Sequence, residues 1–132
     1  MLFRSTEEQL RLIHRHKTGA LINAAIQMGA AAAQATEQQS KELEDYAYGI
    51  GLVFQIVDDV LDVVGSQEQL GKPIGSDSEN GKTTFATLYG VEGAMALAQR
   101  VNEKTCSALR ETFGEKSAFL EQLAQQLLTR KN

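Results

Sequence analysis

Three carboxylates lie within five residues of an otherwise apolar stretch: Asp58, Asp59 and Asp62. On a helix, Asp58 and Asp62 share one face about one turn, or roughly 6 Å, apart, and Asp59 flanks the same stripe. Like charges this close repel and raise one another's pKa unless a cation neutralises them. No Lys or Arg lies within a helical turn to do so. Because Mg²⁺ takes carboxylate oxygens and water when it also holds phosphates, the pattern predicts a magnesium site.

The alternative is a solvated helix end with a fortuitous acidic cluster, since three acids in five residues are common on protein surfaces. The flanking residues argue against a solvated helix, because nearly all of them are apolar: Phe54, Ile56, Val57, Val60, Leu61, Val63 and Val64. The metal site is therefore the favoured interpretation.

Cations and a hydroxyl occur on both sides of this helix in the sequence. Lys72 and Lys82 each follow a glycine in a polar stretch, where flexible backbone lets them reach inward. Lys17 and Thr18 stand at the start of an apolar helix upstream. Each lysine alone is more often a solvated surface residue. Together with the carboxylates, they form a set of groups suited to binding a diphosphate.

Four stretches in this order resemble the trans-polyprenyl diphosphate synthases, most closely the C-terminal part of the bacterial farnesyl (geranyltrans) type. They are HKTGALI at 16–22, YGIGLVFQIVDDVLDVVG at 48–65, LGKPIGSD at 70–77 and GKTTFATLYG at 81–90. The resemblance covers most of residues 10–100 and weakens to helical pattern alone after that. It implies an all-α helical bundle, a partial isoprenoid-synthase fold, with residues 1–132 as one partial domain that carries the second aspartate-rich motif.

The resemblance implies that Mg²⁺ is held by Asp58, Asp59 and Asp62, with Asp58 as the direct ligand. Lys17 and Lys72 would contact the diphosphate of the allylic substrate.

The resemblance also implies roles nearer the reacting carbons. Thr18 and Gln55 would sit at the reacting end of the pocket, and Phe54 would line it near the isopentenyl unit. Lys82 would lie at the rim of the phosphate site. The implied reaction ionises an allylic diphosphate and joins the resulting cation to isopentenyl diphosphate, while Mg²⁺ and cationic side chains stabilise the departing diphosphate.

Two departures from the family pattern stand out. Ala86 occupies a position where the family has proline, which removes no reacting group. The second is larger: Asp45 is the only Asp before Asp58, and the chain contains no Arg-Arg pair, so the first aspartate-rich motif is absent. We therefore expect this chain to be an inactive fragment unless an N-terminal half completes it.

Two other function classes stay open on this sequence. One is a non-catalytic helical partner subunit or interaction module that keeps the second half of the fold. The other, weaker one is a different magnesium–diphosphate enzyme such as a terpene cyclase. The placement of Lys17, Thr18 and Lys72 favours the elongating synthases.

Composition bounds the function further. The chain has 132 residues, one proline and a net charge of −4, which suits a small helical domain and argues against nucleic acid as a partner. The single Cys106 excludes an internal disulfide and is expected to pack in the core. No signal peptide or membrane span is readable, so we expect a cytoplasmic protein.

The periodicity of apolar residues predicts five helices. The first begins at a capping box over 5–8 and ends near His16, and the second covers 17–35. A polar junction at 37–40 precedes a long helix over 41–64, with Gly65 as its C-terminal cap. After a loop over 66–82 come helices over 91–113 and 115–130, split at Gly114.

Other residues with chemical potential are interpreted as structural. His14 and His16, two residues apart, fall on different helix faces and are expected at the surface or a helix end. Tyr46 and Tyr48 are expected to pack in or cap the core. Gly49 and Gly51 indicate either close helix packing or room for a ligand. The broad apolar faces of helices 17–35 and 41–64 predict self-association.

Overall fold

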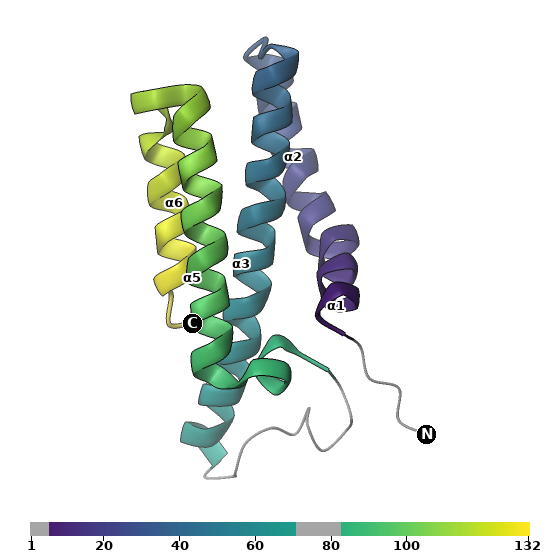
Figure 1. Cartoon of the computed structure of the whole chain (residues 1–132), viewed down its shortest axis with the longest axis vertical. Helices are drawn as coiled ribbons and strands as arrows, with labels where there is room; N and C mark the ends of the chain where they lie inside the picture. The colour runs from purple at the N-terminus through teal and green to yellow at the C-terminus, as the bar shows by residue number, and fades with distance from the viewer. Residues whose placement is uncertain (1–5, 71–82) are drawn as a thin grey trace.

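The structure is a computed structural model that describes residues 6–70 and 83–132. Its helices stand side by side along the long axis of the molecule, in the order α6, α5, α3 and α2 across Figure 1. The described residues contain no strand, which confirms the predicted all-α class. None of the helices in the described part is long and apolar enough to cross a membrane.

The first three elements form one continuous helical segment. Helix α1 spans Glu7–His14 and is N-capped by Thr6, whose hydroxyl accepts from the Gln9 amide at 3.2 Å. A π-helical turn, η1, follows at Arg15–Gly19 and leads directly into α2 at Ala20–Ala32. The helix begins where a capping box was predicted, but the box pairs Thr6 with Gln9 rather than spanning 5–8. The predicted break near His16 is wrong, because backbone hydrogen bonds continue through the π turn.

Helix α3, the central element, runs from Glu37 to Leu70 and is longer than predicted at both ends. It begins early because the Thr36 hydroxyl accepts from the Gln39 amide at 3.1 Å, while the Gln39 side chain accepts from the Thr36 amide at 2.9 Å. This reciprocal capping box replaces the predicted polar junction at 37–40. Gly65 lies inside the helix rather than capping it, so that prediction is also wrong.

The last third of the chain folds back along α3. Helix α5 spans Phe85–Phe113 with a kink at Gly90, whose φ of 73° departs from helical geometry. A 3₁₀ turn, η2, at Gly114–Ser117 joins it to α6 at Ala118–Thr129. The predicted split at Gly114 is confirmed, whereas α5 starts six residues before the predicted 91. Of the predicted loop over 66–82, residues 66–70 continue α3 and 71–82 lie outside the described residues.

Two apolar clusters hold α3 against its neighbours. One joins Val53, Ile56, Val57 and Val60 of α3 to Phe85 and Leu97 of α5 and to Leu10 of α1. The other gathers around Tyr46, which is fully buried and donates its hydroxyl to the Leu120 carbonyl of α6 at 2.8 Å. Cys106 is buried in this second cluster, in agreement with the packing role predicted for it.

The two mid-helix glycines of α3 mark places where another helix comes close. A Cβ at Gly51 would lie 3.2 Å from the Gly19 Cα, and one at Gly49 would lie 2.2 Å from the Thr105 hydroxyl of α5. Close packing therefore accounts for both glycines.

Candidate functional site

The π turn η1 places Lys17 and Thr18 beside the middle of α3. Single π turns within helices occur frequently at functional sites, because the extra residue re-aims neighbouring side chains. The Gln55 amide nitrogen donates to the Thr18 hydroxyl at 3.0 Å, which joins η1 to α3 across 37 residues of sequence. Lys17 is exposed on the same turn. The structure thus brings together Thr18 and Gln55, which were predicted to act at one end of a pocket.

Asp58 faces a cation that sequence patterns did not identify. The Arg130 guanidinium lies 3.7 Å from the Asp58 carboxylate, with the Arg130 side chain 18% exposed and the Asp58 side chain 47% exposed. Arg130 also donates to the Phe54 carbonyl at 3.1 Å and stacks over the Phe54 ring at 4.3 Å. A partly buried guanidinium held by three contacts is a fixed positive charge beside this carboxylate.

Asp59 points to a different neighbour. Its carboxylate accepts a hydrogen bond of 3.0 Å from the main-chain N–H of Phe85, the first residue of α5. Asp62, one turn along α3 from Asp58, is exposed. The two adjacent carboxylates therefore engage different elements, Asp58 the C-terminal segment and Asp59 the start of α5.

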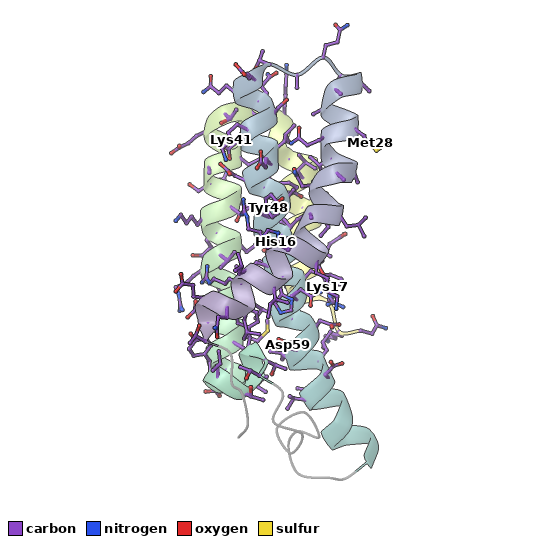
Figure 2. The ribbon with its side chains drawn as sticks, turned by 90° about the vertical axis from the view of Figure 1, so that its right-hand side faces the viewer. His16, Lys17, Met28, Lys41, Tyr48 and Asp59 are labelled. Carbon is purple, nitrogen blue, oxygen red and sulfur yellow. The ribbon has the colours of Figure 1, made fainter. Side chains whose placement is uncertain are left out.

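His14 is close enough to two predicted site residues, Lys17 and Asp58, for their charges to affect its pKa. Burial lowers the pKa of His14 below its usual 6.5, the nearby Lys17 cation lowers it further, and the Asp58 carboxylate opposes both. The Gln55–Thr18 hydrogen bond links the two residues in space, since Lys17 adjoins Thr18 and Gln55 lies about one helical turn before Asp58. Figure 2 shows Lys17 and Asp59 in one half of the molecule, with Met28 and Lys41 towards the other end.

His14 also packs against α5. Its ring stacks on Phe85 with centroids 5.6 Å apart, and its Nδ1 is buried without a hydrogen-bond partner among the described residues. His14 was expected at the surface or a helix end, but it is half-buried and the helical segment continues past it through η1.

Part of the predicted site falls outside the described residues, namely Lys72 and Lys82. Within residues 6–70 and 83–132, no group of three or more His, Cys, Asp or Glu side chains is arranged to hold a metal ion. Mg²⁺ in phosphate-binding enzymes is usually held by one or two carboxylates together with water and substrate phosphates rather than by a complete protein cage. The hard oxygen donors Asp58 and Asp62, both reachable by solvent, are of the type that such an ion requires.

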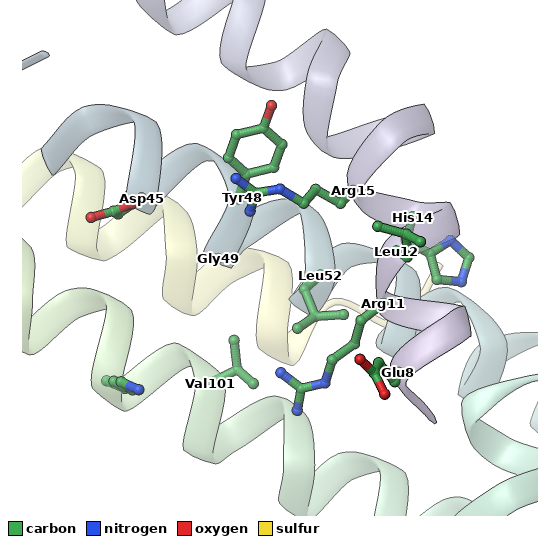
Figure 3. A pocket seen from close by; sticks show the side chains of 11 residues that line it. Glu8, Arg11, Leu12, His14, Arg15, Asp45, Tyr48, Gly49, Leu52 and Val101 are labelled. Atoms are coloured by element: carbon green, nitrogen blue, oxygen red, sulfur yellow. The ribbon is translucent and has the colours of Figure 1, made fainter. Parts of the chain in front are cut away.

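A pocket of about 540 Å³ lies beside these residues, between the α1–η1 segment and α5 and over α3. None of the predicted site residues in the described part of the chain lines it. Figure 3 shows its mixed lining, with Leu52 and Val101 on the inside and the Arg15 guanidinium against the Tyr48 ring at 3.8 Å. Its charges are of both signs, with Arg11, Arg15 and Lys104 close to Glu8 and Asp45, so it indicates no particular ligand.

Comparison with known proteins decides the family. The profile of the family described as polyprenyl synthetase matches residues 2–126. The chain belongs to the polyprenyl synthetase family. This confirms the resemblance seen in the sequence, and the match extends beyond residues 10–100 into the last helix.

Individual members of the polyprenyl synthetase family show the extent of the match. Geranylgeranyl pyrophosphate synthase 9 of Arabidopsis thaliana, a chloroplastic protein, is 42% identical over 125 residues, which are 95% of this chain and 35% of that protein. Farnesyl diphosphate synthase of Geobacillus stearothermophilus is 44% identical over 89 residues, 67% of this chain and 30% of that protein.

A solved structure confirms the isoprenoid-synthase fold. A crystal structure of a Marinomonas sp. MED121 protein, provisionally described as a farnesyl-diphosphate synthase, superposes with a TM-score of 0.74 at 34% identity. The superposition covers 96% of this chain and 42% of that one. The chain therefore spans well under half the length of these relatives.

Sequence reasoning missed two residues at this site, Arg130 and His14. Arg130 lies 72 positions from Asp58 at the end of an amphipathic helix, where a basic residue is ordinary. No local pattern marks either residue, because both reach the site only through tertiary packing.

Proposed function

We propose that this chain forms the diphosphate-binding wall of a prenyltransferase that joins an allylic diphosphate to isopentenyl diphosphate in isoprenoid biosynthesis. The observation that carries the proposal is the Gln55–Thr18 hydrogen bond, which holds the η1 turn with Lys17 and Thr18 against the turn of α3 that contains Gln55 and Asp58. Membership of the polyprenyl synthetase family supports the same reaction class.

Each side chain has a distinct part in such a reaction. Lys17 binds a terminal phosphate of the allylic substrate and stabilises negative charge as the diphosphate leaves. The Gln55 side-chain nitrogen donates its hydrogen bond to Thr18, so the side-chain oxygen is the atom that Gln55 offers to a substrate. An oxygen dipole of this kind stabilises positive charge that develops on the allylic carbon. Phe54, stacked beneath Arg130, supplies an apolar wall that excludes water from the cation.

Asp58 and Asp62 are the residues that would hold Mg²⁺ in this proposal. The ion would neutralise phosphate oxygens and so lower the barrier to departure of the diphosphate. Lys72 and Lys82, outside the described residues, are proposed to complete the phosphate site. The cytoplasmic location also stays a prediction, because relatives include proteins named chloroplastic and mitochondrial.

Binding is tested without turnover by a thermal shift. Mg²⁺ with inorganic diphosphate should raise the melting temperature of the chain, because a ligand that binds only the folded state at 100 times its Kd adds about 2.7 kcal/mol. Asp58→Ala should lose most of that shift.

The matched control for Asp58→Ala is Asp45→Ala, a carboxylate on the same helix that pairs with the exposed Lys41 at 3.0 Å. A surface pair of this kind contributes little to stability, so the control should keep the full shift. An equal shift in Asp58→Ala and in the unaltered chain would contradict the assignment.

A second candidate function is a non-catalytic helical partner subunit. It is favoured by the exposed apolar face of α2, where Leu21 and Met28 are each 74% exposed. This alternative predicts association with another helical chain and no thermal response to Mg²⁺ and diphosphate.

A further inference from the structure

The first residue of α5 is held from two sides. From α3, the Asp59 carboxylate accepts the Phe85 N–H at 3.0 Å. The first N–H groups of a helix have no partner within the helix, and a carboxylate placed there also interacts favourably with the helix dipole. Thr84, the N-cap of α5, is buried and engages Thr87, so the Asp59 bond adds to a complete capping box.

From the other side, the His14 ring packs against the Phe85 ring. The ring of Phe85 is fully buried, and the His14 imidazole stacks on it at 30° with centroids 5.6 Å apart. His14 is the last residue of α1 and directly precedes the π turn that bears Lys17 and Thr18. Phe85 therefore contacts both walls of the candidate site, one through its main chain and one through its ring.

Helix geometry explains why adjacent carboxylates serve different neighbours. Successive residues are rotated by about 100° around a helix axis, so Asp58 and Asp59 cannot face the same direction. Asp58 faces Arg130, and Asp59 faces the start of α5. Asp62 lies one turn along α3 from both residues and is closer in direction to Asp58, four residues away, than to Asp59, three residues away.

We propose that Asp59 is a positioning residue, which with His14 clamps Phe85 and so fixes α5 and the π turn relative to the Asp58–Asp62 pair. This inference rests on the proposed function, because the site that it positions is the proposed diphosphate site. It assigns to Asp59 a role other than the share in metal binding that the resemblance implied for it. The clamp requires a hydrogen-bond acceptor at the Asp59 position but does not require its negative charge.

That requirement separates the clamp from a metal ligand. Asp59→Asn keeps an oxygen acceptor of the same length and removes the charge, whereas Asp59→Ala removes both. In titration calorimetry with Mg²⁺ and inorganic diphosphate, we expect Asp59→Ala to weaken binding by about 10- to 100-fold, as losses of supporting hydrogen bonds around metal sites do. Asp59→Asn should weaken it far less. Equal losses in the two variants would overturn the clamp and make Asp59 a ligand.

The clamp is also measured directly by amide hydrogen exchange at Phe85, with no ligand present. The Phe85 amide should be protected in the unaltered chain, stay protected in Asp59→Asn, and exchange at the rate of an open peptide in Asp59→Ala. An unprotected Phe85 amide in the unaltered chain would overturn the proposal. His14→Phe, which keeps a stacked ring, should bind Mg²⁺ and diphosphate more tightly than His14→Ala, and equal binding by these two variants would remove His14 from the clamp.

The binding and exchange experiments distinguish failure of the proposed function from failure of the clamp. If the unaltered chain does not bind Mg²⁺ and diphosphate while Phe85 exchange depends on Asp59 as expected, the proposed function fails and the clamp remains as a structural contact. If Asp58→Ala abolishes binding while Phe85 exchange ignores Asp59, the proposed function stands and the clamp fails.

Discussion

The surroundings of His14 lower the pKa of its imidazole. Burial and the Lys17 cation lower its pKa, with Asp58 opposing them. A histidine whose folded pKa lies below the unfolded value binds protons more weakly in the folded chain. Its contribution to stability is therefore complete above pH 6.5 and is lost as the pH falls through 6.5 towards the folded pKa.

We expect this loss of stability at low pH to disappear when His14 is replaced by a residue that does not titrate. Chemical denaturation at several pH values between about 7.5 and 5 should show the unaltered chain losing more free energy of unfolding than His14→Gln as the pH falls. The difference between the two proteins should narrow steadily over that range. His16→Gln, which replaces an exposed histidine on the next turn, controls for the removal of any imidazole. A constant difference across the range would show that His14 is not desolvated.

At the level of residues, sequence spacing identified the carboxylates but not their partners. The pairing of Asp58 and Asp62 follows from helix periodicity alone. The contacts of Asp58 with Arg130 and of Asp59 with Phe85 span 72 and 26 residues, so they depend on how α6 and α5 return along α3. The stacking of His14 on Phe85 depends on the same return.

At the level of elements, glycines set how closely the helices approach. Gly49 faces the branched side chain of Thr105 on α5, where a Cβ would lie 2.2 Å from the hydroxyl and 2.7 Å from the methyl group. Threonine is restricted at χ1, so it cannot turn away easily. Gly29 of α2, in contrast, borders open space, and a Cβ added there would meet nothing within 4 Å.

We therefore expect opposite results from the same substitution at these two positions. Gly49→Ala should destabilise the fold by about 1–3 kcal/mol, because overpacking forces the helices apart. Gly29→Ala should stabilise it by about 0.5–1 kcal/mol, because alanine has the higher helix propensity. Urea unfolding of both variants gives the comparison. A neutral Gly49→Ala would mean that α3 and α5 pack more loosely than described.

The boundaries of the elements were predictable where capping residues mark them. Thr6 and Gln9 start α1, and the same threonine-to-glutamine spacing at Thr36 and Gln39 starts α3, although the polar composition there favours a junction between helices. Gly65 was expected to end α3, but a glycine costs a helix only about 1 kcal/mol, and the helix continues through it to Leu70. The π turn at 15–19 has no signature in residue composition.

At the scale of the whole molecule, α2 stands at the edge of the bundle (Figure 1). Leu21, Ala25, Met28 and Ala32 recur at spacings of three and four residues and are all exposed. Nearby, Leu12 is 55% exposed and Ile13 is 50% exposed. Such spacing is typical of the contact face between paired helices, and small residues within it let another helix approach closely.

We expect this stripe to make the isolated chain self-associate, because contiguous apolar patches of more than a few hundred Å² are rare on soluble monomers. Light scattering coupled to size-exclusion chromatography should show a species larger than 14.4 kDa whose fraction grows with concentration. The double variant Leu21→Gln, Met28→Gln should shift it to the monomer.

Phe119 provides the matched control for that double variant. Its side chain is 72% exposed on α6, at the other edge of the bundle from α2. Phe119→Gln removes a similar exposed apolar surface without touching the α2 stripe, so it should leave association unchanged. If the control alone produced the monomer, the contact would lie on α6. An unaltered chain that stayed monomeric and unfolded cooperatively would show that the bundle needs no partner helix over α2.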